Sequence, residues 1–381
     1  MNVKTDPVRE LFVIVIYIFC NSLFVYKYIS RITIYPSIVL TLYIVCICLF
    51  IALIYGIIDF NVSAKSWNIL YLIITIISAV CLAIVMLQFD PSTIKVGRYP
   101  AIQDWLSRLL QGEFPYSSET KPSGFPFLFA LVFPFYLLGD SGLFQIFAFV
   151  IFSVLLYIRH NKDSFNSFRC ILLLLASPMF LYEIVVRSEL FSNMVIVILF
   201  LSIFNYFKRK TNLFSLVIFG LAGGFLLSTR GVVLLIYLIF FGYYFKERKP
   251  VQAVTFTFSM AAGFLITLIP FMVWDKFYFL NNGPFAVQMS YITLWMLILA
   301  VVVSILCALT ITSEKTLYFA AACTLFGVVL VSFLLMIYNT GWHGALIDSG
   351  FDISYFAFVL PFLLFSLDFT KNADHSLDAK Y

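Results

Sequence analysis

Residues 68–89 read NILYLIITIISAVCLAIVMLQF, an apolar run without a single charged side chain. A helix that crosses the roughly 30 Å hydrocarbon core of a bilayer needs about 20 residues of this kind. Soluble domains are about 25% charged, whereas this chain of 381 residues is 11% charged and 62% hydrophobic, with a mean hydropathy of +1.02. The composition therefore predicts an all-α polytopic membrane protein and excludes a soluble enzyme, a disordered chain, a collagen and a coiled coil.

Apolar runs of this type recur along the whole chain, at 11–29, 37–58, 68–89, 126–138, 142–158, 169–186, 190–207, 213–229, 231–245, 251–273, 291–311, 317–338 and 354–369. The run at 126–138 would reach only about 20 Å as a helix, and it contains Pro126 and Pro134. We expect it to be a re-entrant or interfacial segment, and the others to form about twelve transmembrane helices. The first run is interpreted as a transmembrane helix because no small-residue cleavage site of a signal peptide follows it.

The distribution of Lys and Arg indicates the orientation, because cytoplasmic loops are enriched in these residues. Twelve spans with the N- and C-termini cytoplasmic place fifteen Lys and Arg inside and nine outside. If 126–138 also crossed, the basic loops 159–169, 208–210 and 246–249 would face outward. We therefore expect a multi-pass protein of a bacterial inner (cytoplasmic) membrane. Its net charge of +5 is explained by this orientation, and no nucleic-acid partner is expected.

Cysteine and histidine usage predicts no disulfide framework, no cysteine zinc site and no multi-histidine metal site. The seven cysteines are odd in number, lie in apolar runs and form no CxxC motif, so we interpret them as buried small hydrophobic residues. The three histidines are too scattered for a multi-histidine metal site. Small residues at Gly220, Gly224 and Ser228 predict a helix-packing face.

Two outer segments carry most of the polar residues outside the spans. In the first large outer loop, 90–125, the stretch 100–111 predicts an amphipathic helix in the membrane interface. Asp104 and Arg108 lie at i, i+4 on its polar face, and its apolar face comprises Ile102, Trp105, Leu106, Leu109 and Leu110. The second outer loop, 339–353, contains His343, Asp348 and Asp352.

Charged residues also gather at the outer ends of two spans, where they predict a polar cavity because charge at membrane depth costs roughly 2.5–3.5 kcal/mol. Glu183, Arg187 and Glu189 lie near the end of 169–186, and Arg230 lies in the short turn after 213–229. Structural alternatives stay open for three residues. Arg187 could pair with Glu183 one turn away, Arg230 could reach up to the headgroups, and Asp90 could cap the segment that follows it.

Several motifs follow one another in the first two thirds of the chain. LQFD ends at Asp90, YPAIQDWLSRLL follows, and QGEFPY at 111–116 forms a G..PY turn. A Pro-rich segment, KPSGFPFLFALVFPFYLLGDSGLFQ, occupies 121–145. SPMFLYEIVVRSELFSN occupies 177–193, and LSTR ends at Arg230. Together these motifs resemble the GT-C superfamily of integral-membrane glycosyltransferases, which use polyprenyl-phosphate sugars.

The resemblance covers 68–250 and implies a domain organisation for the chain. Residues 1–67 would be additional N-terminal spans, 68–250 the GT-C-like module with the outer loop 90–125, and 251–381 C-terminal spans with the outer loop 339–353. The implied activity is glycosyl transfer at the extracytoplasmic face, in polysaccharide biosynthesis of the cell envelope. The donor would be a polyprenyl-phosphate sugar and the acceptor a glycan, a lipid or a protein. A divalent metal is optional in this superfamily, and no residue is assigned to one.

The resemblance also implies roles for individual residues. Asp90 would be the general base, Asp104 is the second candidate for that role, and Glu189 would be an accessory acid. Arginines in the outer region would bind the donor phosphate through paired N–H donors, and the residues assigned to this site are Arg187, Arg230, Arg98 and His343. One departure leaves an inactive relative open. In the family, the position of the acid relative to the G..PY glycine corresponds to a residue near Arg98 here. Asp90 lies further from that glycine than this position, and Asp104 lies closer to it.

Two other classes of membrane protein remain as alternatives. An O-antigen-type polysaccharide polymerase or ligase would also have arginines in two outer loops. A flippase for lipid-linked saccharides, or another transporter, is expected to have paired broken helices or an inverted repeat near the midplane. The sequence indicates neither feature, and its charges gather at one face, which favours an enzyme.

Overall fold

The computed structural model describes residues 7–56, 63–91, 98–207, 212–290 and 292–368, and every regular element in these ranges is a helix. The predicted all-α class is therefore confirmed. In chain order the elements are α1 (Pro7–Ile29), α2 (Pro36–Gly56), α3 (Ala64–Gln88), α4 (Arg98–Gln111), η1 (Pro115–Ser117), α5 (Pro126–Leu137), α6 (Leu143–Arg159), α7 (Ser164–Leu175), α8 (Pro178–Val185), α9 (Leu190–Phe207), α10 (Leu213–Leu227), α11 (Val233–Phe245), α12 (Pro250–Trp274), α13 (Lys276–Asn281), α14 (Pro284–Met289), α15 (Leu294–Thr310), α16 (Glu314–Trp342), η2 (His343–Ile347), η3 (Ile353–Phe358) and α17 (Val359–Ser366).

Six helices in the described part of the chain are long and apolar enough to cross a membrane, and the number rises to eight if each of two bent helix pairs forms one span. The outward faces of these helices carry exposed large apolar side chains, among them Leu42, Ile76, Ile266 and Leu299. Exposed apolar surface of this extent is unfavourable in water and suits the acyl chains of a bilayer. The fold is therefore that of a polytopic membrane protein.

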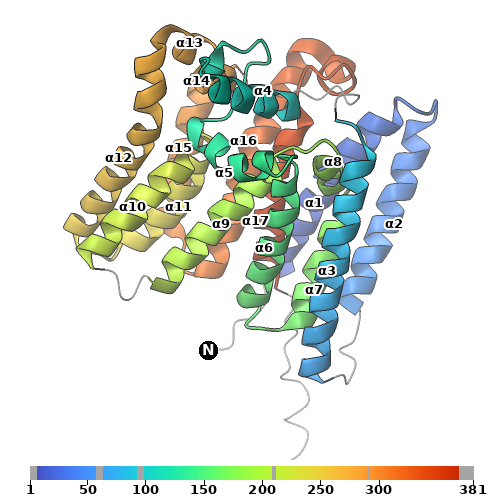
Figure 1. The fold of residues 1–381 in the computed structure, drawn as a ribbon. Helices are drawn as coiled ribbons and strands as arrows, with labels where there is room; N and C mark the ends of the chain where they lie inside the picture. Colours follow the sequence, from blue (N-terminus) through green and yellow to red (C-terminus); the bar gives the residue numbers. More distant parts are fainter. Residues whose placement is uncertain (1–6, 57–62, 92–97, 208–211, 291, 369–381) are drawn as a thin grey trace, which may run out of the picture.

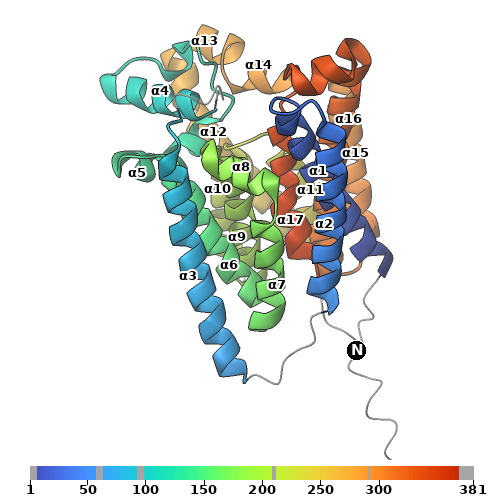
Figure 2. The same ribbon diagram turned by 90° about the vertical axis from the view of Figure 1, so that its right-hand side faces the viewer.

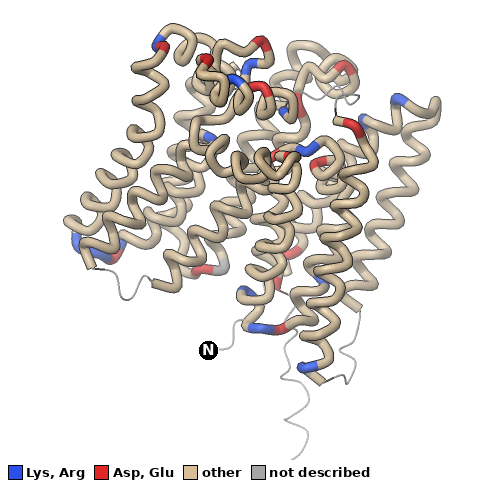
Figure 3. The backbone as a smooth tube through the Cα atoms, viewed as in Figure 1, with Lys and Arg blue, Asp and Glu red and all other residues tan. Residues whose placement is uncertain are grey.

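The long helices run between two ends of the bundle (Figures 1 and 2). We call the end at the top of Figure 1 the upper end; it carries α4, α5, α13, α14 and the turns around η2. Lys, Arg, Asp and Glu concentrate near the two ends and leave the middle of the bundle almost free of charge (Figure 3). This separation of charge agrees with an apolar layer around the middle.

The short helix α5 starts and finishes at the upper end. Before it, Phe125 N donates to Thr229 O over 3.1 Å. After it, Asp140 forms an ion pair with Arg187, whose guanidinium also bonds to the carbonyl of Phe89 at the end of α3. The residues on both sides of α5 are thus bonded to turns at the upper end. This agrees with the prediction that the short apolar run at 126–138 does not cross the membrane.

The amphipathic helix predicted at 100–111 is present as α4, which lies across the upper end (Figure 1). Ile102, Trp105 and Leu106 are buried, and Trp105 stacks on Phe129 of α5 with ring centroids 4.0 Å apart. Leu110, also on the predicted apolar face, is exposed.

The predicted packing face of α10 is confirmed by its contact with α12. A Cβ atom at Gly220 would lie 2.7 Å from Phe256 O, and a Cβ at Gly224 would collide with Met260 O. Only glycine permits this approach of the two backbones, as in small-xxx-small pairs of membrane helices.

The span predicted at 169–186 is broken, which the sequence reading did not expect. α7 and α8 are bent by 67° relative to each other. Ser177 caps α8 with Pro178 in its first turn. Asn21 of α1 accepts hydrogen bonds from Ser177 Oγ at 2.6 Å and Met179 N at 3.1 Å. The backbone groups freed by the break are therefore satisfied from a neighbouring helix, as buried polar groups must be.

All seven cysteines are free thiols, but their predicted burial is only partly confirmed. Cys20 and Cys170 are buried, Cys307 and Cys323 are half-buried, and Cys46, Cys48 and Cys81 are exposed. The exposed thiols lie on α2 and α3, whose outward faces are apolar and poorly covered by protein. A small apolar thiol is compatible with such a lipid-facing surface.

The course of α5 gives a prediction about topology. In a cysteine-free background in sealed vesicles, Glu119→Cys and Leu138→Cys should react with an impermeant maleimide from the same side, because α5 returns to the end at which it starts. Lys249→Cys, at the opposite end, should react only after the vesicles are opened from the other side. Labelling of positions 119 and 138 from opposite sides would mean that α5 crosses the membrane.

Candidate functional site

A first buried arginine stands at the start of α4. Arg98 is 8% exposed, and its Nη2 lies 2.6 Å from Asp352 Oδ2. Its guanidinium also lies over the ring of Tyr355, 4.9 Å from the centroid. Asp352 is fixed in turn, because its Oδ1 accepts from Ser354 N at the start of η3. Burial alone would lower the pKa of Arg98, but Asp352, Tyr355 and Glu183 raise it above its ordinary value. Arg98 is therefore a permanent buried cation.

A second buried arginine lies in the turn between α10 and α11. Arg230 is 4% exposed and forms an ion pair with Glu189, which is 2% exposed. Its Nη1 donates to Ser123 Oγ over 2.6 Å. Burial lowers the pKa of Arg230 to about 10, so the side chain still carries its charge at neutral pH. The sequence alternative in which Arg230 reaches up to the headgroups is wrong, because the guanidinium is enclosed by protein.

The turn that holds Arg230 is clamped to the loop before α5 by one side chain. Gln288 Nε2 donates to Ser123 O over 2.6 Å, and Gln288 Oε1 accepts from Gly231 N over 3.0 Å. Gln288 belongs to α14, which the sequence did not predict. The clamp holds Ser123 and Arg230 together and fixes the direction of the Arg230 side chain.

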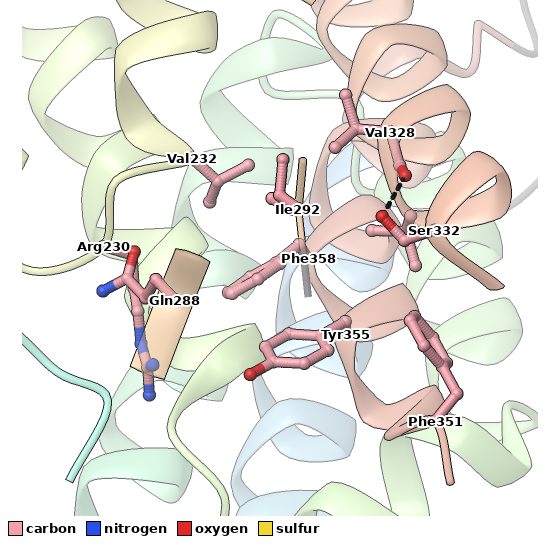
Figure 4. Close-up of a pocket in the computed structure, with 10 residues that line it drawn as sticks. Arg230, Val232, Gln288, Ile292, Val328, Ser332, Phe351, Tyr355 and Phe358 are labelled. Atoms are coloured by element: carbon pink, nitrogen blue, oxygen red, sulfur yellow. Dashed lines mark hydrogen bonds between the residues drawn. The ribbon is translucent and has the colours of Figure 1, made fainter. Parts of the chain in front are cut away.

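Arg230 lines one wall of a pocket at the upper end (Figure 4). The pocket has an empty volume, including the part open to solvent, of about 550 Å³. Its walls are mainly apolar and consist of Arg230, Val232, Gln288, Ile292, Val328, Val329, Ser332, Phe351, Tyr355 and Phe358. The hydroxyl of Tyr355 points toward Arg230 across the pocket (Figure 4). Arg98 lies over the ring of the same tyrosine, so Tyr355 connects the pocket that Arg230 lines to the second buried arginine.

Both arginines keep an unused hydrogen-bond donor. Arg98 Nη1 and Arg230 Nε are buried and have no hydrogen-bond partner in the part of the chain that the structure describes. A buried donor that stays unsatisfied costs about 1–3 kcal/mol. Two such donors on permanent cations favour an anionic acceptor, and guanidinium groups fit the oxygens of phosphate.

Arg187 has a different environment from the other two. It lies after α8 with a φ of +53°, in the left-handed region. Its Nε lies 3.2 Å from Asp140 Oδ2, and its Nη2 donates to Met86 O at 3.1 Å and Phe89 O at 3.2 Å. The predicted alternative, a helical pair with Glu183, is wrong because α8 ends at Val185 and Arg187 leaves the helix. Arg187 joins the end of α3 to the turn before α6.

Stability should depend on Arg187 because its removal leaves a carboxylate and two carbonyls without their donor. We expect Arg187→Ala to lower the free energy of unfolding by about 3 kcal/mol, which a thermal melt in detergent would register as a lower Tm. Arg108→Ala is the matched control: Arg108 pairs with Asp104 and Glu113 at the surface and should cost no more than about 1 kcal/mol. Equal Tm values for the two variants would contradict this structural role.

The three predicted carboxylates lie in three different environments. Asp90 is exposed and follows Phe89, whose carbonyl Arg187 holds. Asp104 pairs with Arg108 at 3.1 Å and accepts a hydrogen bond from Ser118. Glu189 is enclosed with Arg230. The alternative in which Asp90 caps the next segment involves residues 92–97, which lie outside the described residues.

His343 is not brought to the pocket beside Arg230. Its side chain is 75% exposed, and its Nδ1 lies 3.0 Å from Asp348 Oδ2. α16 is kinked at Gly341, whose φ is +73°, so His343 lies beyond a break in the helix. Of the four residues predicted to bind phosphate, the structure therefore brings together only Arg98 and Arg230.

Sequence reasoning missed the residues around these two arginines, Ser123, Gln288 and Tyr355, and it also missed Asp140, the partner of Arg187. Asp352 was noted only as a charge in an outer loop. A weak local signal existed, since Asp352 precedes Ile353–Phe358 as a capping residue. Nothing in the sequence links Asp352 and Tyr355 to Arg98, more than 250 residues earlier.

Comparisons with known proteins returned no match: no protein-family model fits the chain, and neither a curated protein nor a solved structure is similar to it. Among the described residues, no group of three His, Cys, Asp or Glu side chains is placed to hold a metal ion. The fold and the pocket define the class: an all-helical membrane protein with one buried arginine in the wall of an apolar pocket and a second over a tyrosine of that pocket.

Proposed function

We propose that the protein is a membrane glycosyltransferase that moves a sugar from a polyprenyl-phosphate donor to an acceptor at the extracytoplasmic face. The observation that carries this proposal is that Arg230 lines the apolar pocket and Arg98 lies over Tyr355 of the same pocket, each with an unused buried N–H. We call this region the Arg98–Arg230 mouth. A donor of this class has an anionic phosphate attached to a long apolar chain. The phosphate would bind at the two arginines, and the apolar chain would enter the apolar pocket.

The same arrangement suits the chemistry of the leaving group. The acceptor hydroxyl attacks the anomeric carbon, and the bond from that carbon to the phosphate oxygen breaks with its electron pair on the oxygen. The phosphate thus gains negative charge in the transition state. Arg98 and Arg230 are already desolvated and oriented, so they stabilise this charge without reorganisation. Glu189 and Asp352 hold the two guanidinium groups in place.

Asp90 is the proposed general base. Its carboxylate would take the proton of the attacking acceptor hydroxyl, so that the products are the glycosylated acceptor and polyprenyl phosphate. Its exposure and its place directly after a rigid helix support this role over Glu189, which is enclosed and paired. The first turn of α4 links Asp90 to the arginines: Tyr99 lies 5.0 Å from the Arg187 guanidinium, and Arg98 is its neighbour.

For the topology we infer twelve crossings with the upper end outside. The six long helices and the two bent pairs give eight, and the short apolar helices other than α5 give four. Arg159 ends α6, Lys162 follows it, and Lys246, Arg248 and Lys249 connect α11 to α12; these helix ends lie at the lower end (Figure 1). The positive-inside tendency therefore supports a cytoplasmic lower end. The termini predicted to be cytoplasmic, 1–6 and 369–381, lie outside the described residues.

The transporter alternative gains some support from the broken span α7–α8, since broken helices mark the sites of many transporters. However, the backbone at this break bonds to Asn21, because Met179 N donates to Asn21 Oδ1. A polymerase or ligase would use a polyprenyl diphosphate, which two arginines could also bind. The choice of donor separates this alternative from the proposed function.

The test uses the purified full-length protein in nanodiscs, with polyprenyl-phosphate sugars and polyprenyl-diphosphate sugars offered separately. We expect the release of polyprenyl phosphate from the monophosphate donor, at a rate that rises when native membrane extract is added as a source of acceptor. Release only from the diphosphate donor would favour a polymerase or ligase. Movement of intact donor between leaflets without release of its lipid would favour a flippase.

A further inference from the structure

A second pocket adjoins the pocket beside Arg230. It lies between α15 and α16, with an empty volume of about 550 Å³. Its walls are Trp295, Met296, Leu299, Ala300, Val303, Cys323, Thr324, Gly327, Val328 and Val331. Val328 lines both pockets. The two pockets therefore share one wall residue of α16.

The second pocket is open on the side that faces the lipid. Trp295, Leu299 and Val303 of α15 line it and are themselves exposed. From Ser332 in the first pocket to Cys323 in the second, α16 covers about 14 Å at 1.5 Å per residue. We call this apolar second pocket, with the shared Val328, the α15–α16 groove.

We propose that the tail of the lipid donor leaves the Arg98–Arg230 mouth along this α15–α16 groove. The inference rests on the proposed function and adds the path and the length of chain that the protein recognises. The occupant is a single linear apolar chain with an anionic head, because the groove is lined almost entirely by apolar groups while the mouth carries unused cationic donors. Chains that extend past Val328 gain contacts that shorter chains lack.

Gly327 provides a direct way to close the groove. A Cβ atom at this position would meet nothing within 4 Å, so a larger side chain fits without disturbing the helix and fills the open space. We expect Gly327→Phe to weaken the binding of undecaprenyl phosphate at least about tenfold and to leave that of geranyl phosphate, whose chain stays in the first pocket, unchanged. Ala261→Phe, on the exposed face of α12, is the matched control and should keep both affinities.

A second measurement needs no substitution. Cys323 lies in the groove as a half-buried thiol, and Cys81 on α3 is an exposed reference. In detergent, undecaprenyl phosphate should slow the alkylation of Cys323 at least severalfold and leave Cys81 unaffected, whereas geranyl phosphate should protect neither. Protection of Cys323 by both lipids, or by neither, would overturn the groove assignment, as would an unchanged preference for the long chain in Gly327→Phe. If the wild-type protein binds neither prenyl phosphate, the proposed function fails as well.

Discussion

Replacing Arg230 and Glu189 together by glutamine is expected to lower the affinity for undecaprenyl phosphate at least about 30-fold. The pair of substitutions removes the cation without leaving a buried carboxylate unpaired, so the fold should survive. The lost interaction is a charge-assisted contact with the phosphate in a desolvated site, worth at least about 2 kcal/mol. Titration of the purified protein in nanodiscs with undecaprenyl phosphate measures the effect, with a thermal melt as the check on folding.

Arg31→Gln is the matched control for this experiment. Arg31 is an exposed arginine of the same end, where it donates to Ile347 O and Ser349 Oγ. Its loss should leave the affinity within about twofold, as expected for a solvated surface charge. Equal effects of the two changes would mean that Arg230 serves only the fold or attracts anions nonspecifically.

Asp90→Asn is expected to reduce transfer by a factor of about 10²–10⁴, the usual contribution of a general base. Asparagine keeps the shape of the side chain and cannot accept the acceptor's proton, so donor binding and Tm should not change. The measurement is the acceptor-stimulated release of polyprenyl phosphate, compared with donor affinity on the same preparation.

Asp104→Asn is the control for Asp90 because it removes a carboxylate from the same outer loop. Asp104 already pairs with Arg108 and accepts from Ser118, so its change should impair turnover by less than about tenfold. Full turnover by the Asp90→Asn protein would remove Asp90 as the base. Full turnover by both variants would remove the case for any base in the loop 90–125.

The elements of this fold were largely predictable because each depends on local sequence. Apolar runs without charge placed the long helices, and the periodicity of 100–111 placed α4 within two residues of its start. The helices α13 and α14 were missed because Asp275 and Gly283, which precede them, are ordinary turn signals without an apolar run. The break between α7 and α8 was missed because its cost is offset by Asn21, a partner more than 150 residues away.

The candidate site was predictable only in part, for the same reason. Arg230 and Glu189 stood out as charges beside apolar runs, and Arg98 entered through the spacing of a motif. Their partners could not be named, since the pairing of Arg98 with Asp352 or of Arg230 with Ser123 depends on how distant turns meet at the upper end. The partners of Arg187 could not be predicted either. Its guanidinium bonds to Asp140 and to the carbonyls of Met86 and Phe89, and its role in phosphate binding stays a prediction.

The most direct test of the central claim is an experimental structure of the protein in nanodiscs with undecaprenyl phosphate. The account predicts density for the phosphate within hydrogen-bond distance of Arg98 Nη1 and Arg230 Nε, with Tyr355 beside it and the start of the chain in the pocket at Phe358 and Val328. Lipid phosphate bound at another face, or a pocket mouth without density at saturating lipid, would contradict it.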